Sequence, residues 1–345
     1  MQYHSVLVAS TMENPETASP TSSPFAPLIA NHDLHQEIKQ LLPSLPRTKG
    51  LPAVDLCLYQ NFWCPVISIQ PVISFQRNFQ AQDQDIIIAS NPKSGSTWLK
   101  SLIFSVVNRS HYTPSTTPLL TENPHALVPF FEFDVFAQNQ IPDLTTVPSP
   151  RLFGTHLPYS GLSESIKKSN CSVVYICRNP FDSAVSFWHH ACRLGNVQCS
   201  MEEYFEIYFK GTFWFGPFWE HVLGFWKASL ENPKKVLFLK YEDLKEDIDL
   251  QLKRIAEFLG FGFSEEEVKN GVVQEIAKLC SLSNLKDLEV NKNGKYLSVY
   301  PNKNYFRTGN VGESAHYLSP SLKLHLENLM QEKLSGSGLS FKIPG

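Results

Sequence analysis

The feature that most constrains the fold is a repeated alternation of short apolar runs with longer stretches of helical periodicity. Four runs have the length and composition of buried strands: DIIIAS (85–90), RLFGTHL (151–157), CSVVYIC (171–177) and VLFLKY (236–241). Strands that alternate with helices favour a parallel sheet covered on both faces. We therefore expect an α/β fold, in which one domain has a central, mostly parallel sheet flanked by helices.

Helical patterns follow three of these runs. TWLKSLIFSVV (97–107) has helical length, and a second helix is expected over about 180–194, with Asn179 as its N-cap. The third stretch, DLKEDIDLQLKRIAEFLG (243–260), is amphipathic and is expected to end at Gly260. The alternation thus extends over much of the chain.

Composition limits the class of protein. The chain has 345 residues, of which 42% are hydrophobic and 18% charged, so it can bury a core. Its net charge of −3 gives no field that would draw it to nucleic acid or an anionic membrane, and no stretch approaches the length of a membrane span. Residues 1–30 are rich in Ser, Thr and Pro and are expected to form a disordered tail, which leaves 31–345 as the folded domain.

The cysteines and the N-terminus indicate the compartment. There are seven cysteines, and none of them forms a C-x-x-C pair. An odd count without such pairs is typical of a reducing compartment. The first residues have neither the basic segment nor the continuous apolar core of a secretory signal. We expect a cytoplasmic protein.

The stretch NPKSGSTW (91–98) joins a predicted strand to a predicted helix. The free amides of a helix start favour an anion, and the single glycine, Gly95, allows a close approach of ligand to backbone. Lys93 adds a positive charge, and Trp98 offers a face on which a base can stack. A Walker A loop has a second glycine and places its lysine after it, so this loop is of another kind. The alternative is a polar turn beside a core tryptophan.

Charged residues follow the other predicted strands as well. His156 in GTHLP (154–158) ends one strand and Arg178 closes another, at the sheet edge where α/β proteins bind ligands. A structural histidine and an ordinary surface ion pair are the alternatives for these two residues. The segment NKNYFRTGNVG (302–312) fits either a phosphate-wrapping loop or a solvated one. The polar stretch 281–316 around it is expected to act as a lid or a binding loop.

Together these segments resemble the soluble, cytosolic-type sulfotransferases, and most of all their plant branch. The motifs span residues 85–313 in the family's order: NPKSGSTW, GTHLP, RNPFDSAVSFWHH (178–190), FGPFWEHVLGFW (215–226), YEDLKED (241–247) and FRTGNVGE (306–313). The resemblance implies a P-loop-like nucleotide-binding domain that uses 3′-phosphoadenosine 5′-phosphosulfate (PAPS) as co-substrate and no metal. It also implies a small hydroxylated acceptor of plant secondary metabolism.

The resemblance assigns roles in catalysis to two residues. His156 would be the general base that takes the acceptor's hydroxyl proton, and Lys93 would donate to the bridging oxygen as the sulfuryl group leaves. Phe130 and Phe133, in VPFFEF (128–133), would line an apolar acceptor pocket, although at least one of them is equally explained as core. The acceptor would be phenolic, a flavonoid, or a hydroxylated hormone such as a hydroxyjasmonate or a steroid.

The resemblance also implies a set of residues that bind the donor. Its members would contact the 5′-phosphate (Lys93, Ser94, Gly95, Ser96 and Thr97), the adenine (Trp98 and Phe215) or the 3′-phosphate (Arg178, Ser186, Arg307, Thr308 and Gly309). The resemblance further implies that the stretch 281–316 is a 3′-phosphate-binding loop.

The sequence departs from the family's pattern at several positions. Thr308 stands where a lysine is usual, which should weaken the hold on the 3′-phosphate by roughly tenfold or more. Glu313 and Ser314 replace an Asp-Trp pair. Leu282 stands where many members have a phenylalanine that faces adenine, and Gly154 where many animal members have a lysine.

Other functions stay open on the sequence alone. A non-catalytic nucleotide or metabolite binder is supported by the altered 306–314 motif. A P-loop kinase conflicts with the missing Walker A spacing, and a protein-tyrosine sulfotransferase would need a secretory signal. Neither nucleic acid nor a membrane is expected as a partner, and the protein is expected to be a monomer or a weak homodimer.

Overall fold

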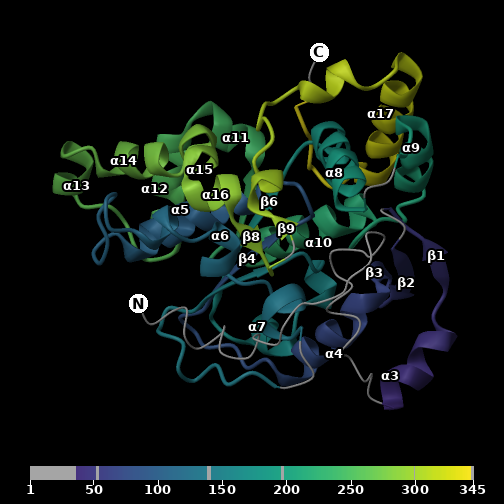
Figure 1. Cartoon of the computed structure of the whole chain (residues 1–345), viewed down its shortest axis with the longest axis horizontal. Coiled ribbons are helices and arrows are strands. Elements are labelled where there is room, and N and C mark those ends of the chain that lie inside the picture. Colours follow the sequence, from purple (N-terminus) through teal and green to yellow (C-terminus); the bar gives the residue numbers. More distant parts are fainter. Residues whose placement is uncertain (1–35, 52–53, 138–140, 196–197, 299, 343–345) are drawn as a thin grey trace.

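The computed structural model describes residues 36–51, 54–137, 141–195, 198–298 and 300–342, which Figure 1 shows as a cartoon. At its centre is a four-stranded parallel sheet with the strand order β5-β4-β6-β7. Its strands are β4 (Ile86–Ser90), β5 (Leu152–Thr155), β6 (Ser172–Cys177) and β7 (Val236–Lys240). Each lies in one of the four apolar runs, so the predicted strands and the parallel sheet are confirmed. The predicted tail, 1–30, lies outside the described residues.

Helices cover both faces of this sheet (Figure 1). Side chains alternate along β4, so that Ile86 and Ile88 join one buried cluster while Ile87 and Ala89 join another. The first cluster includes residues of α5 (Ser96–Asn108), α12 (Ile248–Phe258) and α14 (Val272–Leu279). The second includes residues of α4 (Ile69–Asn78), α8 (Pro180–Gly195) and α10 (Phe218–Glu231). Burial on both faces explains why the strands read as unbroken apolar runs.

The expected helices form with one correction. α5 and α8 occupy the predicted ranges, and the Asn179 side chain accepts a hydrogen bond from the Asp182 amide at 2.9 Å, as an N-cap does. The prediction of one helix over 243–260 was wrong, because α11 (Tyr241–Glu246) and α12 are separate. Asp247 breaks the pattern with φ −144°, and its side chain caps the second helix instead.

A small antiparallel sheet was not foreseen. It consists of β1 (Arg47–Lys49), β2 (Asp55–Tyr59) and β3 (Phe62–Pro65), in that order. Gln60 and Asn61 make the turn between β2 and β3 with φ of 48° and 66°. Since neither residue is glycine, the sequence lacks the usual signal of a tight hairpin.

Short elements complete the fold, and the predicted lid segment, 281–316, contains several of them. Within the described ranges no helix is long and apolar enough to cross a membrane. In the described ranges the remaining α-helices and β-strands are α3 (Gln36–Leu41), α6 (Pro124–Leu127), α7 (Glu164–Lys168), α9 (Met201–Phe209), α13 (Glu265–Lys269), α15 (Leu282–Asp287), α16 (Glu289–Asn293), β8 (Lys295–Tyr296), β9 (Tyr300–Pro301) and α17 (Pro320–Leu334).

Candidate active site

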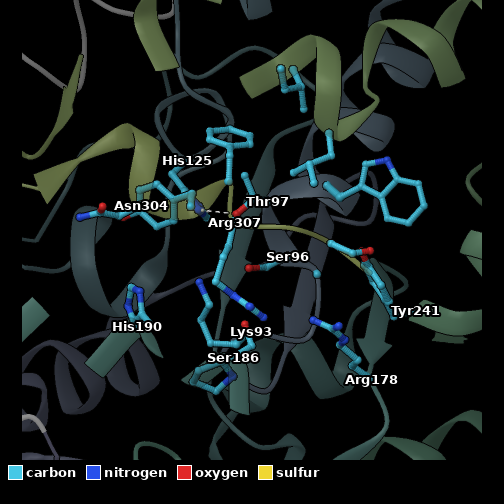
Figure 2. A pocket seen from close by; sticks show the side chains of 18 of the residues that line it. Lys93, Ser96, Thr97, His125, Arg178, Ser186, His190, Tyr241, Asn304 and Arg307 are labelled. Carbon is cyan, nitrogen blue, oxygen red and sulfur yellow. Dashed lines mark hydrogen bonds between the residues drawn. The ribbon is translucent and has the colours of Figure 1, made fainter. Parts of the chain in front are cut away.

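A cavity of about 330 Å³ lies at the carboxyl edge of the parallel sheet. Ala89 of β4 pairs with Thr155 of β5 and Tyr175 of β6, so the three strands end level with one another. The segments that follow them therefore meet at one edge, as expected for a parallel sheet. Of the fifteen site residues predicted from the sequence, all but Ser94, Phe215 and Thr308 line this cavity. Figure 2 shows Lys93, Ser96, Arg178 and Ser186 turned toward the same opening.

The loop between β4 and α5 has a backbone that only certain residues tolerate. Gly95 has φ 108°, and a Cβ there would lie 2.8 Å from the ring of Tyr241. Lys93 also has a positive φ, 69°. This course places the first amides of α5, which have no intrahelical carbonyl to bind, at the cavity. The loop is therefore built to receive an anion.

Positive charge concentrates around this loop. Burial, reinforced by the charges of Arg307, Arg178 and Arg193, lowers the pKa of Lys93 to about 7. The cations that line the cavity are Lys93, Arg178, Arg193, Lys245 and Arg307, and no Asp or Glu is among the described residues that line it. An anion in the cavity would relieve this mutual repulsion.

Several buried polar atoms around the cavity lack a partner within the described part of the chain. They include Ser94 Oγ, Trp98 Nε1, Arg178 Nε and Arg307 Nε. Buried donors are normally hydrogen-bonded, so a group of them around one cavity indicates a ligand with acceptor atoms. Phosphate oxygens meet that requirement, and the residues present therefore fit a phosphorylated ligand.

His156 follows β5 and is 9% exposed. Its Nδ1 lies 2.8 Å from the carbonyl oxygen of Ser90, which can only accept, so Nδ1 carries the proton. Burial lowers the pKa of His156 to about 3, although the bond to Ser90 opposes the shift. The imidazole is therefore neutral near pH 7, with an unprotonated Nε2. The backbone amide of His156 donates a hydrogen bond to Glu132 Oε1 at 2.6 Å, which holds the backbone of this residue in place.

Aromatic side chains line the part of the cavity next to His156. The ring of Phe130 lies 4.6 Å from the imidazole and that of Phe133 lies 6.2 Å away, centroid to centroid. The other aromatic residues that line the cavity outside the donor loop are Phe187, Trp214, Tyr241, Tyr296, Tyr300, Tyr305 and Phe306. A flat or apolar molecule would fit among such rings.

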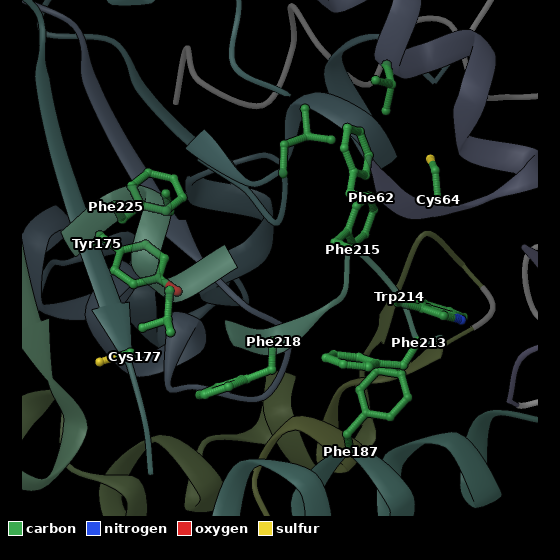
Figure 3. Close-up of a cluster of buried hydrophobic side chains, with 14 of the residues drawn as sticks. Phe62, Cys64, Tyr175, Cys177, Phe187, Phe213, Trp214, Phe215, Phe218 and Phe225 are labelled. Carbon is green, nitrogen blue, oxygen red and sulfur yellow. The ribbon is translucent and has the colours of Figure 1, made fainter. Parts of the chain in front are cut away.

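Phe215 does not lie where the sequence suggested. Its backbone amide donates to the Trp63 carbonyl at 2.7 Å, which holds the residue against β3. Its fully buried ring lies 6.0 Å from Phe133 and 6.3 Å from His156, centroid to centroid, and belongs to the buried hydrophobic cluster that Figure 3 shows. The ring of Trp98, by contrast, belongs to a residue that lines the cavity, and it lies 5.5 Å from the ring of Tyr241, centroid to centroid. Because Phe215 is fully buried and does not line the cavity, the structure does not support its expected contact with an adenine.

The altered 306–314 motif forms its own cluster. Arg307 Nη1 and Thr308 Oγ1 both donate to the carboxylate of Glu313. Thr308 is exposed and does not line the cavity, whereas Arg307 does. Leu282 and Gly309 both line it, and a Cβ at Gly309 would lie 2.8 Å from Leu282.

Sequence reasoning missed a buried lysine and histidine behind the site. Lys100 is fully buried, and its Nζ lies 3.2 Å from His125 Nδ1 and 3.1 Å from the centroid of the Phe130 ring. A Cβ on Gly154 would lie 2.6 Å from Nζ, so the glycine leaves room for the lysine. A lone lysine inside the apolar pattern of 97–107 was the available signal for Lys100. His125 gave none.

An α/β fold with an anion-binding loop and a neutral histidine at one sheet edge is typical of enzymes that bind a phosphorylated ligand. Residues 83–338 match the family model described as the sulfotransferase domain, and the chain belongs to this family of enzymes. It is 48% identical over 314 residues to cytosolic sulfotransferase 15 of Arabidopsis thaliana, a match that covers 89% of this chain and 88% of the relative.

Solved structures agree with this family assignment. A sulphotransferase of Arabidopsis thaliana is 40% identical with a TM-score of 0.73, and the match covers 90% of this chain and 98% of that one. Mouse sulfotransferase SULT7A1, complexed with PAP, is 28% identical with a TM-score of 0.62, over 82% of this chain and 96% of that one. The expected family and the α/β fold are thus confirmed.

Proposed function

We propose that this sulfotransferase moves the sulfuryl group of PAPS to a hydroxyl of a small apolar acceptor, with His156 as general base. The observation that carries the proposal is the state of His156. Its Nδ1–H is bound to Ser90, and its unprotonated Nε2 belongs to a residue that lines the same cavity as Lys93. A base must be unprotonated and within reach of the hydroxyl whose proton it takes.

The donor would be held by the residues of the anion site. Lys93 and the loop from Ser94 to Thr97 would bind the 5′-phosphate, and Trp98 would lie against the adenine. Arg178, Ser186, Arg307 and Gly309 would bind the 3′-phosphate. The unpartnered nitrogens of Arg178 and Arg307 support this assignment, as does the mouse relative that binds PAP. When bound, the donor supplies an activated sulfuryl group.

Lys93 and His156 would act on opposite sides of the transferred group. Lys93 would place a positive charge at the bridging oxygen, where negative charge develops as the bond breaks. His156 Nε2 would accept the acceptor's proton while Ser90 stabilises the protonated ring through Nδ1–H. A bound polyanion favours the charged form of both residues, because opposite charges stabilise each other.

The acceptor would occupy the aromatic part of the cavity. Phe133 is half-buried and Phe130 is 4% exposed, so both keep contact with the cavity while they pack on their neighbours. A phenolic, a flavonoid or a hydroxylated hormone such as a hydroxyjasmonate or steroid has the flat, apolar surface that such a lining binds. The oriented His156 and the Lys93 that line one cavity support catalysis over a non-catalytic binder.

The setting of the enzyme follows from the same assignment. We place it in the cytosol, as the names of its relatives do for them. The domain would extend over residues 31–345, with 281–316 as a lid. We expect a monomer or a weak homodimer, and neither nucleic acid nor a membrane as a partner.

A product screen tests this function. The protein is incubated with PAPS and a panel of hydroxylated plant metabolites, and products are examined by mass spectrometry for an added sulfuryl group. We expect at least one sulfated product that requires both PAPS and the wild-type enzyme, with His156→Asn as the matched control. PAP binding without any product would instead support the non-catalytic alternative.

A further inference from the structure

A chain of polar contacts runs from the protein interior to the donor loop. Lys100 Nζ lies 3.2 Å from His125 Nδ1, and His125 Nε2 lies 2.9 Å from Thr97 Oγ1. Lys100 and His125 are 0% and 2% exposed, whereas Thr97 lines the cavity. Figure 2 shows the last link as a dashed line from the His125 ring to Thr97. Two buried residues are thus connected by hydrogen-bond contacts to one hydroxyl of the anion site.

Burial disfavours the ammonium form of Lys100, and several neighbouring groups act against this effect. Burial lowers the pKa of Lys100 to about 7, while the carboxylates of Asp134 and Glu132 oppose this shift. The Phe130 ring lies directly beneath Nζ, 3.1 Å from its centroid, which favours a cation. The missing Cβ of Gly154 supplies the space that the ammonium group occupies.

The chemistry of these groups sets the direction of both hydrogen bonds. An ammonium group only donates, so His125 Nδ1 accepts. Burial holds the pKa of His125 well below its usual value, so the ring is neutral and its single proton lies on Nε2. Nε2–H therefore donates to Thr97 Oγ1, and the hydrogen of that hydroxyl is left for another acceptor. Within the described part of the chain Thr97 Oγ1 has no second partner.

We propose that Lys100 and His125 are positioning residues that turn the Thr97 hydroxyl hydrogen toward the 5′-phosphate end of the donor. The inference rests on the proposed function, since it presumes that a phosphate occupies the loop. Its physical content is preorganisation: the hydroxyl is a fixed donor before the ligand arrives, so binding costs no reorientation. A histidine in the other tautomer would compete with the ligand for the same hydrogen.

The test compares two ligands that differ only in the 5′-phosphate. Isothermal titration calorimetry gives Kd for PAP (adenosine 3′,5′-bisphosphate) and for adenosine 3′-monophosphate. Thr97→Val removes the hydroxyl at nearly constant volume, and His125→Phe keeps the ring contacts while it removes both nitrogens. We expect Thr97→Val to weaken PAP binding by about tenfold, the scale of a hydrogen bond to a charged group. His125→Phe should weaken it less, by about three- to fivefold, because the hydroxyl remains but is no longer oriented before binding. Binding of the 3′-monophosphate should change less than about twofold, within the usual scatter of non-contacting substitutions.

Two further variants separate positioning from folding. Lys100→Met should show the same selective loss as His125→Phe. Ser101→Ala, which removes a buried hydroxyl bonded to the Trp98 carbonyl one turn along the same helix, should leave both affinities unchanged. In the double variant Thr97→Val/His125→Phe the loss should not exceed that of Thr97→Val alone, because His125 acts through Thr97.

Each other outcome overturns the inference. Equal losses for the two ligands would show that His125 and Lys100 act only on the structure, and additive losses would show that they do not act through Thr97. Unchanged PAP affinity in both His125→Phe and Lys100→Met would also refute it, while the proposed function would stand. Failure of the wild-type protein to bind PAP would instead overturn the proposed function together with this inference.

Discussion

Replacement of His156 by asparagine separates two tasks that the imidazole performs. Nδ1–H anchors the ring to the Ser90 carbonyl at 2.8 Å, and Nε2 is left as the base. The amide nitrogen of asparagine stands where Nδ1 stands and can keep the anchor, but nothing replaces Nε2. His156→Asn should therefore remove the base without release of the strand end that carries the donor loop.

The magnitude follows from the role. A general base contributes about 10²- to 10⁴-fold to the rate, which corresponds to about 3–5 kcal/mol of transition-state stabilisation. We expect kcat to fall by that factor with the acceptor found in the product screen. The Kd of PAP should change less than about twofold, because the anchor to Ser90 is retained. His156→Ala loses the anchor as well and should show the same loss of kcat.

The assay combines product formation by mass spectrometry with PAP binding by calorimetry. Retention of more than about a tenth of the wild-type kcat by His156→Asn would refute His156 as the base. Such a loss would be less than about tenfold, whereas a general base contributes at least about a hundredfold. A large loss of PAP binding in His156→Asn would show instead that the residue supports the donor site.

The same variant gives a test that needs no acceptor. In the folded protein the pKa of His156 is about 3, below the usual value of about 6.5. The unfolded chain therefore binds a proton that the folded protein refuses, and wild-type stability falls as pH drops from about 6.5 toward 3. His156→Asn lacks this group, so its Tm relative to wild type should rise as the pH is lowered. A Tm difference independent of pH would contradict the buried, neutral state.

Three further predictions concern the charges of the site. Because the pKa of Lys93 is about 7 in the free protein and a bound anion raises it, PAP binding should take up a proton and weaken above about pH 7. Calorimetry in buffers of different ionisation enthalpy measures this uptake, which should be smaller in Lys93→Met, and an unchanged uptake would contradict the role of Lys93. Thr308→Lys adds a charge beside Arg307 and offers Glu313 another partner, so it should lower the Kd of PAP by up to about tenfold; an unchanged Kd would count against a 3′-phosphate at this place. Arg193 lines the cavity, is exposed and has no ion-pair partner in the described ranges. An acceptor with a free carboxylate should therefore have a KM up to about fivefold below that of its methyl ester. Equal KM values for the two acceptors, or a preference that survives Arg193→Gln, would refute this prediction.

The sequence predicted the parallel sheet, and twelve of the fifteen predicted site residues line the cavity, for a local reason. Strand, loop and helix signals lie next to one another in NPKSGSTW and in the segments that hold His156 and Arg178. The carboxyl ends of parallel strands must meet at one edge, so the order of motifs along the chain was sufficient to bring these residues together. The same reasoning gave Asn179 its capping role and placed Lys93 at the cavity.

The sequence was less informative where local signals conflict with packing. The helical pattern of 243–260 is continuous, yet the Asp247 side chain prefers to cap the second helix and breaks it. Phe215 carries no sign of its place, because its backbone pairs with β3, a strand far away in the sequence. The hairpin of β2 and β3 lacks a glycine turn and was missed for that reason.

By itself, then, the sequence determined the class of fold, the family and a core of the residues that surround the anion site. Only the tertiary structure decided how those residues are oriented. A carbonyl of β4 determines which nitrogen of His156 carries the proton. The orientation of the Thr97 hydroxyl depends on His125, which in turn contacts Lys100. Lys100 fits there because Gly154 has no side chain. Such orientations depend on contacts between segments distant in the chain, and hydrogen-bond direction is fixed only when both partners are in place.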